Sequence, residues 1–216
     1  MRRKLPLFLV GACVALAGAE VIDRIAVSVG NAVITASDLD REIRVTAFLN
    51  GVKPDFSSAA KRATADRMVE QKLVRRELEL SRFPAPDASA VEAEWNEFRK
   101  QRYPEGSPLE RALAEYGITE QEVKDALLWQ LTLLRFIEIR FRPGVQVSDS
   151  DIEEYFEKDV RPAAEASRPS QSTSLEDYRD RIRETLTGQR ADVELDNWLK
   201  EARQRTEIVF HEEVFQ

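Results

Sequence analysis

Residues 119–141 constrain the fold more than any other part of the chain, because they are apolar on two sides of a helix. Thr119 and Glu122 give a capping-box pattern at the start, and Pro143-Gly144 ends the segment. One apolar stripe with helical spacing comprises Val123, Leu127, Leu131, Leu134, Ile137 and Phe141, and a second comprises Trp129, Leu133 and Phe136. A helix of this kind is normally covered on both sides. We therefore expect a central helix in a mainly helical core.

Helix signals recur on both sides of this central segment. Ser37 is a candidate N-terminal cap for a helix over residues 38–49, and Gly51 is its stop signal. Ser107 followed by Pro108 opens another helix, which ends at Gly117. Gly188 is a point at which the last helix could kink or divide. The further helices that we expect cover residues 58–82, 87–102, 148–160 and 174–205.

Short strands are predicted at both ends of the chain. Residues 21–29 alternate, with Val21, Ile25, Val27 and Val29 expected on one face, and Gly30-Asn31 joins them to an apolar run as a hairpin turn would. Residues 208–210 and 214–215 suggest a last strand. A two-stranded hairpin alone is marginal in water, so the two ends of the chain are expected to pair. The predicted fold class is mainly α, with a small antiparallel β element joining the N- and C-terminal ends.

The N-terminus has the pattern of a secretory signal peptide. Basic residues at positions 2–4 precede an uncharged apolar run, and Ala17-Gly18-Ala19 suits cleavage after Ala19. An uncleaved anchor is the alternative, but the run ends short of the roughly 18 residues that span a bilayer. Lipoprotein processing at Cys13 is a third reading. Residues 1–19 are thus predicted to direct export to the periplasm, without a stable membrane anchor.

Charge and composition exclude several function classes. The chain has 32 basic and 39 acidic residues, and removal of residues 1–19 leaves 29 − 39 = −10. This acidic balance argues against nucleic acid as a partner. Cys13 is the only cysteine and His211 the only histidine, so the mature chain has no thiol for catalysis and no two-histidine zinc site. We expect no cofactor and no metal. His211 is expected to be structural or exposed, and a pH-sensing role is conceivable.

Three stretches resemble SurA-type periplasmic chaperones. Residues 20–39 are similar to the "V-D-x-I-x-A-x-V-N-x-x-V-I-T-x-S-D-L" start of those mature proteins. Residues 142–156 resemble the passage that leads to their proline isomerase module, and residues 178–208, with Trp198, resemble the long helix after it. The resemblance implies a SurA N-terminal-like helical domain.

The isomerase module itself is missing from the pattern. A parvulin domain needs on the order of a hundred residues, but only residues 161–173 occupy its place, with prolines, alanines and serines and no periodicity. We therefore divide the chain into a signal peptide (1–19), a chaperone N-terminal region (20–160), a linker (161–173) and a C-terminal helix and strand that complete the same domain (174–216).

The resemblance implies an ATP-independent chaperone, a holdase, that binds unfolded outer-membrane or secreted polypeptides and is not an enzyme. Two alternatives stay open: an adaptor that binds one defined periplasmic partner, and a degenerate proline isomerase. The candidate client-binding residues are Trp95, Phe98, Tyr103, Trp129, Leu133 and Phe136, because aromatic side chains give large contact areas with few rotamers to freeze. For each group the alternative is core packing, since Trp95 and Phe98 share one helix face and the residues from Trp129 to Phe136 could pack under the terminal helix.

Overall fold

The structure is a computed structural model that describes residues 23–84, 86–104, 108–167 and 174–216. The predictions for the signal peptide, for Cys13, for Val21 and for the Ser107 cap lie outside these described residues. Within the described ranges, no helix is long and apolar enough to cross a membrane.

Both ends of the chain meet in a three-stranded antiparallel sheet, as predicted. The strands are β1 (Ile25–Val29), β2 (Ala32–Thr35) and β3 (Ile208–Phe210), in the order β2-β1-β3. Gly30 has a φ of 56° in the tight turn between β1 and β2, a conformation that glycine adopts at no steric cost. Residues 214–215, expected to be strand, instead lie at the end of the 3₁₀ turn η3 (Glu212–Val214), where both side chains are buried.

One face assignment in the first strand is wrong. Ile25 pairs with Thr35, but the next pair is Val27 with Ile34, so the register shifts at Ala26. Such a bulge adds one residue to a strand and breaks the alternation of its side chains. Ala26, Val27 and Val29 are buried as a result, whereas Ile25 is exposed on the outer face.

The helices agree with the predicted segments, apart from details at their ends. They are α1 (Ala36–Asn50), α2 (Ser58–Ser81), α3 (Ala88–Arg102), α4 (Leu109–Tyr116), α5 (Glu120–Arg140), α6 (Asp149–Tyr155), α7 (Arg161–Ser167) and α8 (Arg179–Gln204). The cap of α1 is Thr35 and not Ser37, because the Asp38 N–H donates to Thr35 Oγ1 while the Asp38 carboxylate accepts from the Thr35 N–H. Helix α8 starts at Arg179 and passes Gly188 without a break.

Part of the expected linker is helical. Residues Phe156–Val160 form a π-helical turn, η2, which continues α6, and Arg161–Ser167 form α7 directly after it. The missing periodicity in this stretch is consistent with a helix that is exposed almost all round, because such a helix has no apolar face to reveal it. The rest of the expected linker, residues 168–173, lies outside the described residues.

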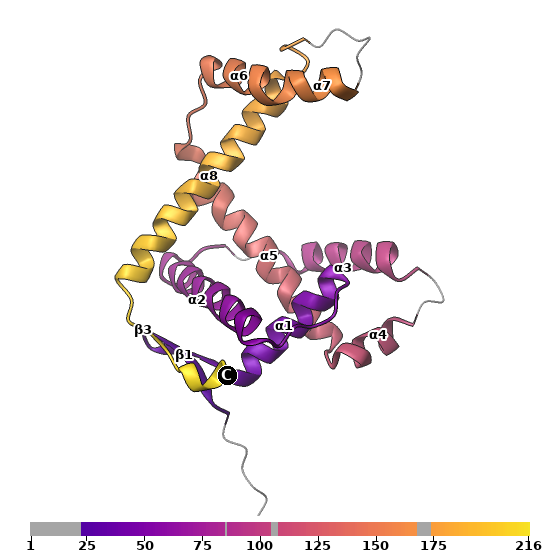
Figure 1. Ribbon diagram of the computed structural model, residues 1–216, viewed down its shortest axis with the longest axis vertical. Coiled ribbons are helices and arrows are strands. Elements are labelled where there is room, and N and C mark those ends of the chain that lie inside the picture. Colours follow the sequence, from indigo (N-terminus) through magenta and orange to yellow (C-terminus); the bar gives the residue numbers. More distant parts are fainter. Residues whose placement is uncertain (1–22, 85, 105–107, 168–173) are drawn as a thin grey trace, which may run out of the picture.

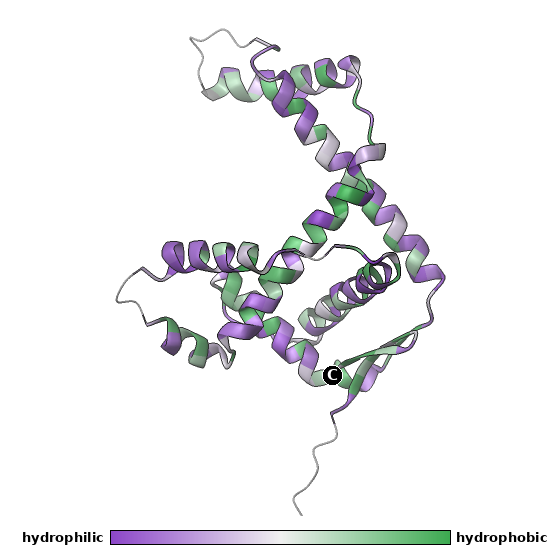
Figure 2. Cartoon of the chain, turned by 180° about the vertical axis from the view of Figure 1, so that it is seen from behind, coloured by the Kyte–Doolittle hydropathy of each residue, from purple (hydrophilic) through white to green (hydrophobic). Residues whose placement is uncertain are grey.

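Helix α5 is the central helix of the main body, which comprises α1–α5, the sheet and the second half of α8, as its two apolar stripes predict. Val123 and Leu127 enter one core cluster with α1, α3 and α4. Trp129 and Phe136 enter another, with α2 and the second half of α8. A third cluster joins the inner face of the sheet to α2 and the end of α8. Figure 2 shows hydrophobic residues along α5 up to the point where it meets α8.

The first half of α8 leaves this body and forms an arm with α6 and α7 (Figure 1). The arm has its own small core, in which Ile152, Phe156 and Ile182 are buried. Helix α8 therefore runs through two separate cores. A short 3₁₀ turn, η1 (Arg142–Gly144), carries the chain from α5 to the arm beside α8.

Phe48 offers a test of the core around α5. Its buried ring contacts the rings of Phe98, Tyr103 and Tyr116 at centroid distances of 5.5–5.7 Å. We expect Phe48→Ala to lower the free energy of unfolding by about 3–5 kcal/mol, measured by urea denaturation. The matched control is Phe56→Ala, since Phe56 is 40% exposed, and we expect a loss below about 1 kcal/mol there. Equal losses would contradict this packing.

Candidate functional site

The predicted client-binding residues of α3 are packed into the core. Trp95 is buried, and its ring stacks on Phe98 at 5.8 Å. Phe98 lies 6.1 Å from the ring of Tyr103, which caps the end of α3. Phe98 and Tyr103 are partly buried against the same cluster. The packing alternative therefore describes these three residues, and Trp95 has almost no surface with which to touch a client.

The second predicted group lies beneath the terminal helix. Phe136 is buried, with its ring 5.7 Å from that of Trp198 on α8. Trp129 is buried under the guanidinium of Arg75, which lies 4.3 Å above the indole ring. Leu133 is partly buried in the same cluster. These residues join α5 to α2 and α8, so their first role is structural.

The first stripe of α5 extends beyond the helices that cover it. Its early members Val123 and Leu127 are buried beneath α3, but Leu134, seven residues after Leu127, is 60% exposed. Residues seven apart lie on the same helix face. Phe141, seven residues further on, is partly buried against Phe136 and against Trp198 of α8. Leu134 thus lies uncovered between the part of the stripe that packs against α3 and the part that packs against α8.

The last residue of the stripe, Phe141, lines a hollow of about 470 Å³ at the junction of α5, η1 and α8. Phe141, Val145 and Val193 line the hollow, and Val193 on α8 is 55% exposed. Arg140, Arg190 and Glu194 stand at the same site. We call the four apolar side chains Leu134, Phe141, Val145 and Val193 the α5–α8 surface.

Val193 is exposed for the same reason as Leu134. The predicted stripe of the last helix includes Ile182 and Leu186, which pack in the arm, and Val193 lies seven residues after Leu186. Below the arm, α8 buries a different face, with Ala191 and Ala202 fully or nearly fully covered. Both helices change their buried face at the junction, and each leaves one apolar residue of the earlier stripe uncovered.

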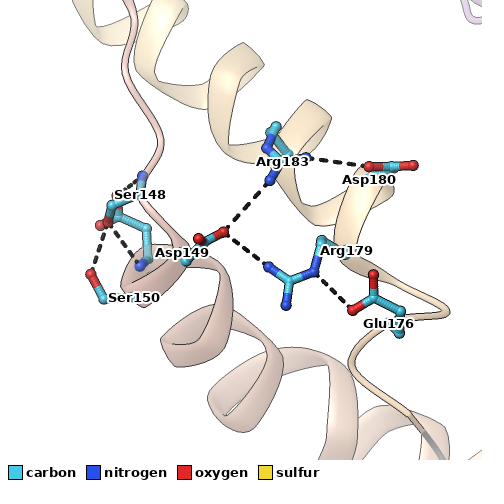
Figure 3. Close-up of polar contacts among 8 residues, drawn as sticks. Ser148, Asp149, Ser150, Glu176, Arg179, Asp180 and Arg183 are labelled. Atoms are coloured by element: carbon cyan, nitrogen blue, oxygen red, sulfur yellow. Dashed lines mark hydrogen bonds and ion pairs between the residues drawn. The ribbon is translucent and has the colours of Figure 1, made fainter.

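Ion pairs hold α8 against the arm and the end of α5. Asp149 at the start of α6 accepts from Arg179 at 2.9 Å and lies 3.7 Å from Arg183 (Figure 3). Ser148 caps α6 through a capping box with Asp151. Arg142 in η1 pairs with Glu184 of α8 and with Glu138 of α5, both at 2.6 Å. Hydrogen bonds to Glu184 and then Glu138 raise the pKa of Arg142.

Asp151 and Arg190 connect the arm to the hollow. Arg190 lies 2.8 Å from the Asp151 carboxylate and donates to the carbonyl of Gln146. The hydrogen bond from Arg190, with the backbone and hydroxyl of Ser148, holds the pKa of Asp151 far below its ordinary range. The contact joins α8 to α6 and to the loop before it at the hollow.

The single histidine, His211, does not have the close side-chain contacts that position a catalytic histidine. Nε2 of His211 lies 3.4 Å from Ser28 Oγ, but Nδ1 lies 3.8 Å from the nearest Glu213 oxygen, which is too long for a hydrogen bond. The His211 backbone N–H donates to the Ala26 carbonyl, so the residue extends the pairing of β3 with β1. Among residues 23–84, 86–104, 108–167 and 174–216, no group of three or more His, Cys, Asp or Glu side chains could hold a metal ion.

Comparison with known proteins assigns no relative to this chain: no protein-family model matches it, and neither does any curated protein.

The exposure of the α5–α8 surface was not predicted from the sequence. Leu134 and Phe141 were recognised as apolar stripe residues but were expected to be buried, and Val145 and Val193 were not singled out. The overlap of two apolar stripes on α5 was the signal available in the sequence. Where the second stripe becomes buried, residues of the first stripe can be left without a covering helix.

The pH dependence of stability tests the arm contact. Because the pKa of Asp151 is lower in the folded state, its stabilising contribution is present above the ordinary carboxyl pKa of about 4 and is lost as pH falls through the folded value. We expect Asp151→Asn to be less stable than wild type near neutral pH, and the gap to narrow below about pH 4. Urea denaturation across pH measures it. Asp180→Asn, whose partner Arg183 is on the same exposed helix turn, is the control. A gap that is constant with pH would contradict the assignment.

Proposed function

We propose that this protein is an ATP-independent periplasmic chaperone that holds unfolded outer-membrane or secreted polypeptides. The observation that carries the proposal is the α5–α8 surface, in which Val193 is 55% exposed and lines a hollow, and Leu134 is 60% exposed two turns before Phe141 of the same hollow. A holdase must keep apolar surface accessible in its folded state, at the risk of its own aggregation. Exposed apolar residues that cluster at a hollow, unlike isolated ones, are typical of interaction sites.

The border of the surface suits an extended polypeptide. Arg140 lines the hollow and, in the described part of the chain, forms no ion pair, so its guanidinium is free to donate to a carbonyl or carboxylate of a client. Apolar side chains of the client would cover Val145 and Val193. Contacts of this kind need no specific sequence, because any extended chain offers carbonyls and frequent apolar residues.

The sequence adds independent support for export and for the class of protein. The pattern of residues 1–19 favours secretion, and residues 20–39 resemble the start of mature SurA-type chaperones. The proposal places the mature protein in the periplasm with Glu20 as its first residue. Mass spectrometry of the protein recovered from a periplasmic extract checks this, and retention of residues 1–19 would contradict it.

Light scattering of an unfolded outer-membrane protein diluted from urea tests the proposed activity. We expect the mature protein at equimolar ratio to slow aggregation. Val193→Asn should weaken client binding roughly fivefold and Leu134→Asn by a similar factor, since each removes about 1 kcal/mol of apolar contact. The matched control is Val52→Asn, because Val52 is 54% exposed in the loop after α1 and lies outside the surface.

Four outcomes would count against this function or against its site. Wild type that fails to slow aggregation rejects the holdase. An equal loss in Val52→Asn and Val193→Asn rejects the α5–α8 surface as its site. Recovery of one stoichiometric partner from the periplasm, in place of many unfolded clients, would favour the adaptor alternative. Catalysis above background in a peptide isomerisation assay would favour the alternative that the protein is a degenerate proline isomerase.

A further inference from the structure

A second hollow, of about 480 Å³, lies at the turn end of the sheet, away from the α5–α8 surface. The β1–β2 hairpin contributes Val29, Asn31 and Ala32, and the bend between α8 and β3 contributes Thr206. Helix α2 supplies the opposite wall. Its lining residues are Lys72, Leu73, Arg75, Arg76, Glu79 and Leu80.

The charge of this hollow is opposite to that of the protein. Lys72, Arg75 and Arg76 line it together with a single carboxylate, Glu79, whereas the whole chain carries a net charge of −7. In the described part of the chain none of the three cations forms an ion pair, although cations elsewhere, such as Arg142 and Arg203, do.

Local geometry explains why Glu79 does not neutralise its neighbours. Glu79 follows Arg75 by four residues, which is the less favourable order for an ion pair on a helix. Arg75 instead lies over the ring of Trp129, 4.3 Å from its centroid. The Arg76 guanidinium reaches over the hairpin, with Nη1 3.9 Å from the point where a Cβ on Gly30 would lie. Arg76 thus extends from α2 toward the hairpin, whereas the guanidinium of Arg75 is engaged with Trp129.

The hollow also has an apolar part. Leu73 and Val29 are buried at its base, and Leu80 at its rim is 73% exposed, the most exposed of the large apolar side chains in the described ranges. Uncovered leucine beside unpaired cations matches a ligand that carries an apolar side chain next to carboxylates. A concave site on an acidic protein fits a peptide better than an anionic lipid surface, which would meet the repulsion of the surrounding charge.

We propose that the hollow between α2 and the β1–β2 turn binds an acidic peptide segment, whose carboxylates contact Lys72 and Arg76 and whose apolar residue packs on Leu80. Arginine side chains favour carboxylates because the guanidinium donates two parallel hydrogen bonds to the two oxygens. The segment belongs to a partner protein. This site does not depend on client binding at the α5–α8 surface.

Fluorescence anisotropy with a labelled peptide of alternating glutamates and leucines tests the proposal on the mature protein. We expect saturable binding that weakens as salt is raised, because salt screens exposed charges. Lys72→Gln combined with Arg76→Gln should bind roughly tenfold more weakly. These two side chains make no ion pair or hydrogen bond in the described structure, so thermal unfolding should be unchanged. The matched control is Lys100→Gln with Arg111→Gln, which removes two exposed cations from α3 and α4.

A charge swap makes the test specific. Lys72→Glu combined with Arg76→Glu should lose the acidic peptide and gain binding to the corresponding peptide of lysines and leucines. Val193→Asn should leave acidic-peptide binding unchanged. Equal binding by wild type and the glutamine double variant would overturn the proposal, as would equal loss in the control pair. Binding to phosphatidylglycerol vesicles without binding to the acidic peptide would also overturn it and assign the hollow to a membrane surface.

Discussion

The packing of α5 beneath α8 is the contact on which the rest of the structure depends. Phe136 and Trp129 enter the core that α5 shares with α2 and α8, and Trp198 covers Phe136 from α8. The other face of α5 packs against α3 and α4, which form a lobe on that side. Because α8 ends next to β3, the same helix also sets where the C-terminal strand joins the N-terminal hairpin. Loss of this contact would separate the lobe, the sheet and the arm.

Much of this architecture could be predicted from local signals. The capping box at Thr119, the stop at Gly117 and the pairing of both chain ends follow from side chains within a few positions of each other, or from the instability of an isolated hairpin. The face of Ile25 could not be predicted, because a bulge at Ala26 is decided by how β2 and the core fit together. Helix α7 gave no signal because it is almost entirely solvated.

The candidate site was harder to predict than the fold. Aromatic residues were the natural candidates for client contact, and Trp95 and Phe136 instead stabilise the core, where large rings bury the most area. Periodicity reports which residues could share a face and not whether a partner covers that face. Leu134 and Val193 are exposed because α5 and α8 each change their buried face at the junction with the arm. That change is a property of three-dimensional packing.

The same junction connects stability to the proposed function. Ion pairs of Arg142 with α5 and α8, and of Asp151 with Arg190, join these elements beside the hollow that Val193 lines. The most direct test places a photo-crosslinking amino acid at position 193, with position 52 as the comparison, and irradiates the mature protein with an unfolded outer-membrane protein. We expect client adducts from position 193 and few from position 52. Equal adducts from both positions, or none from position 193, would contradict it.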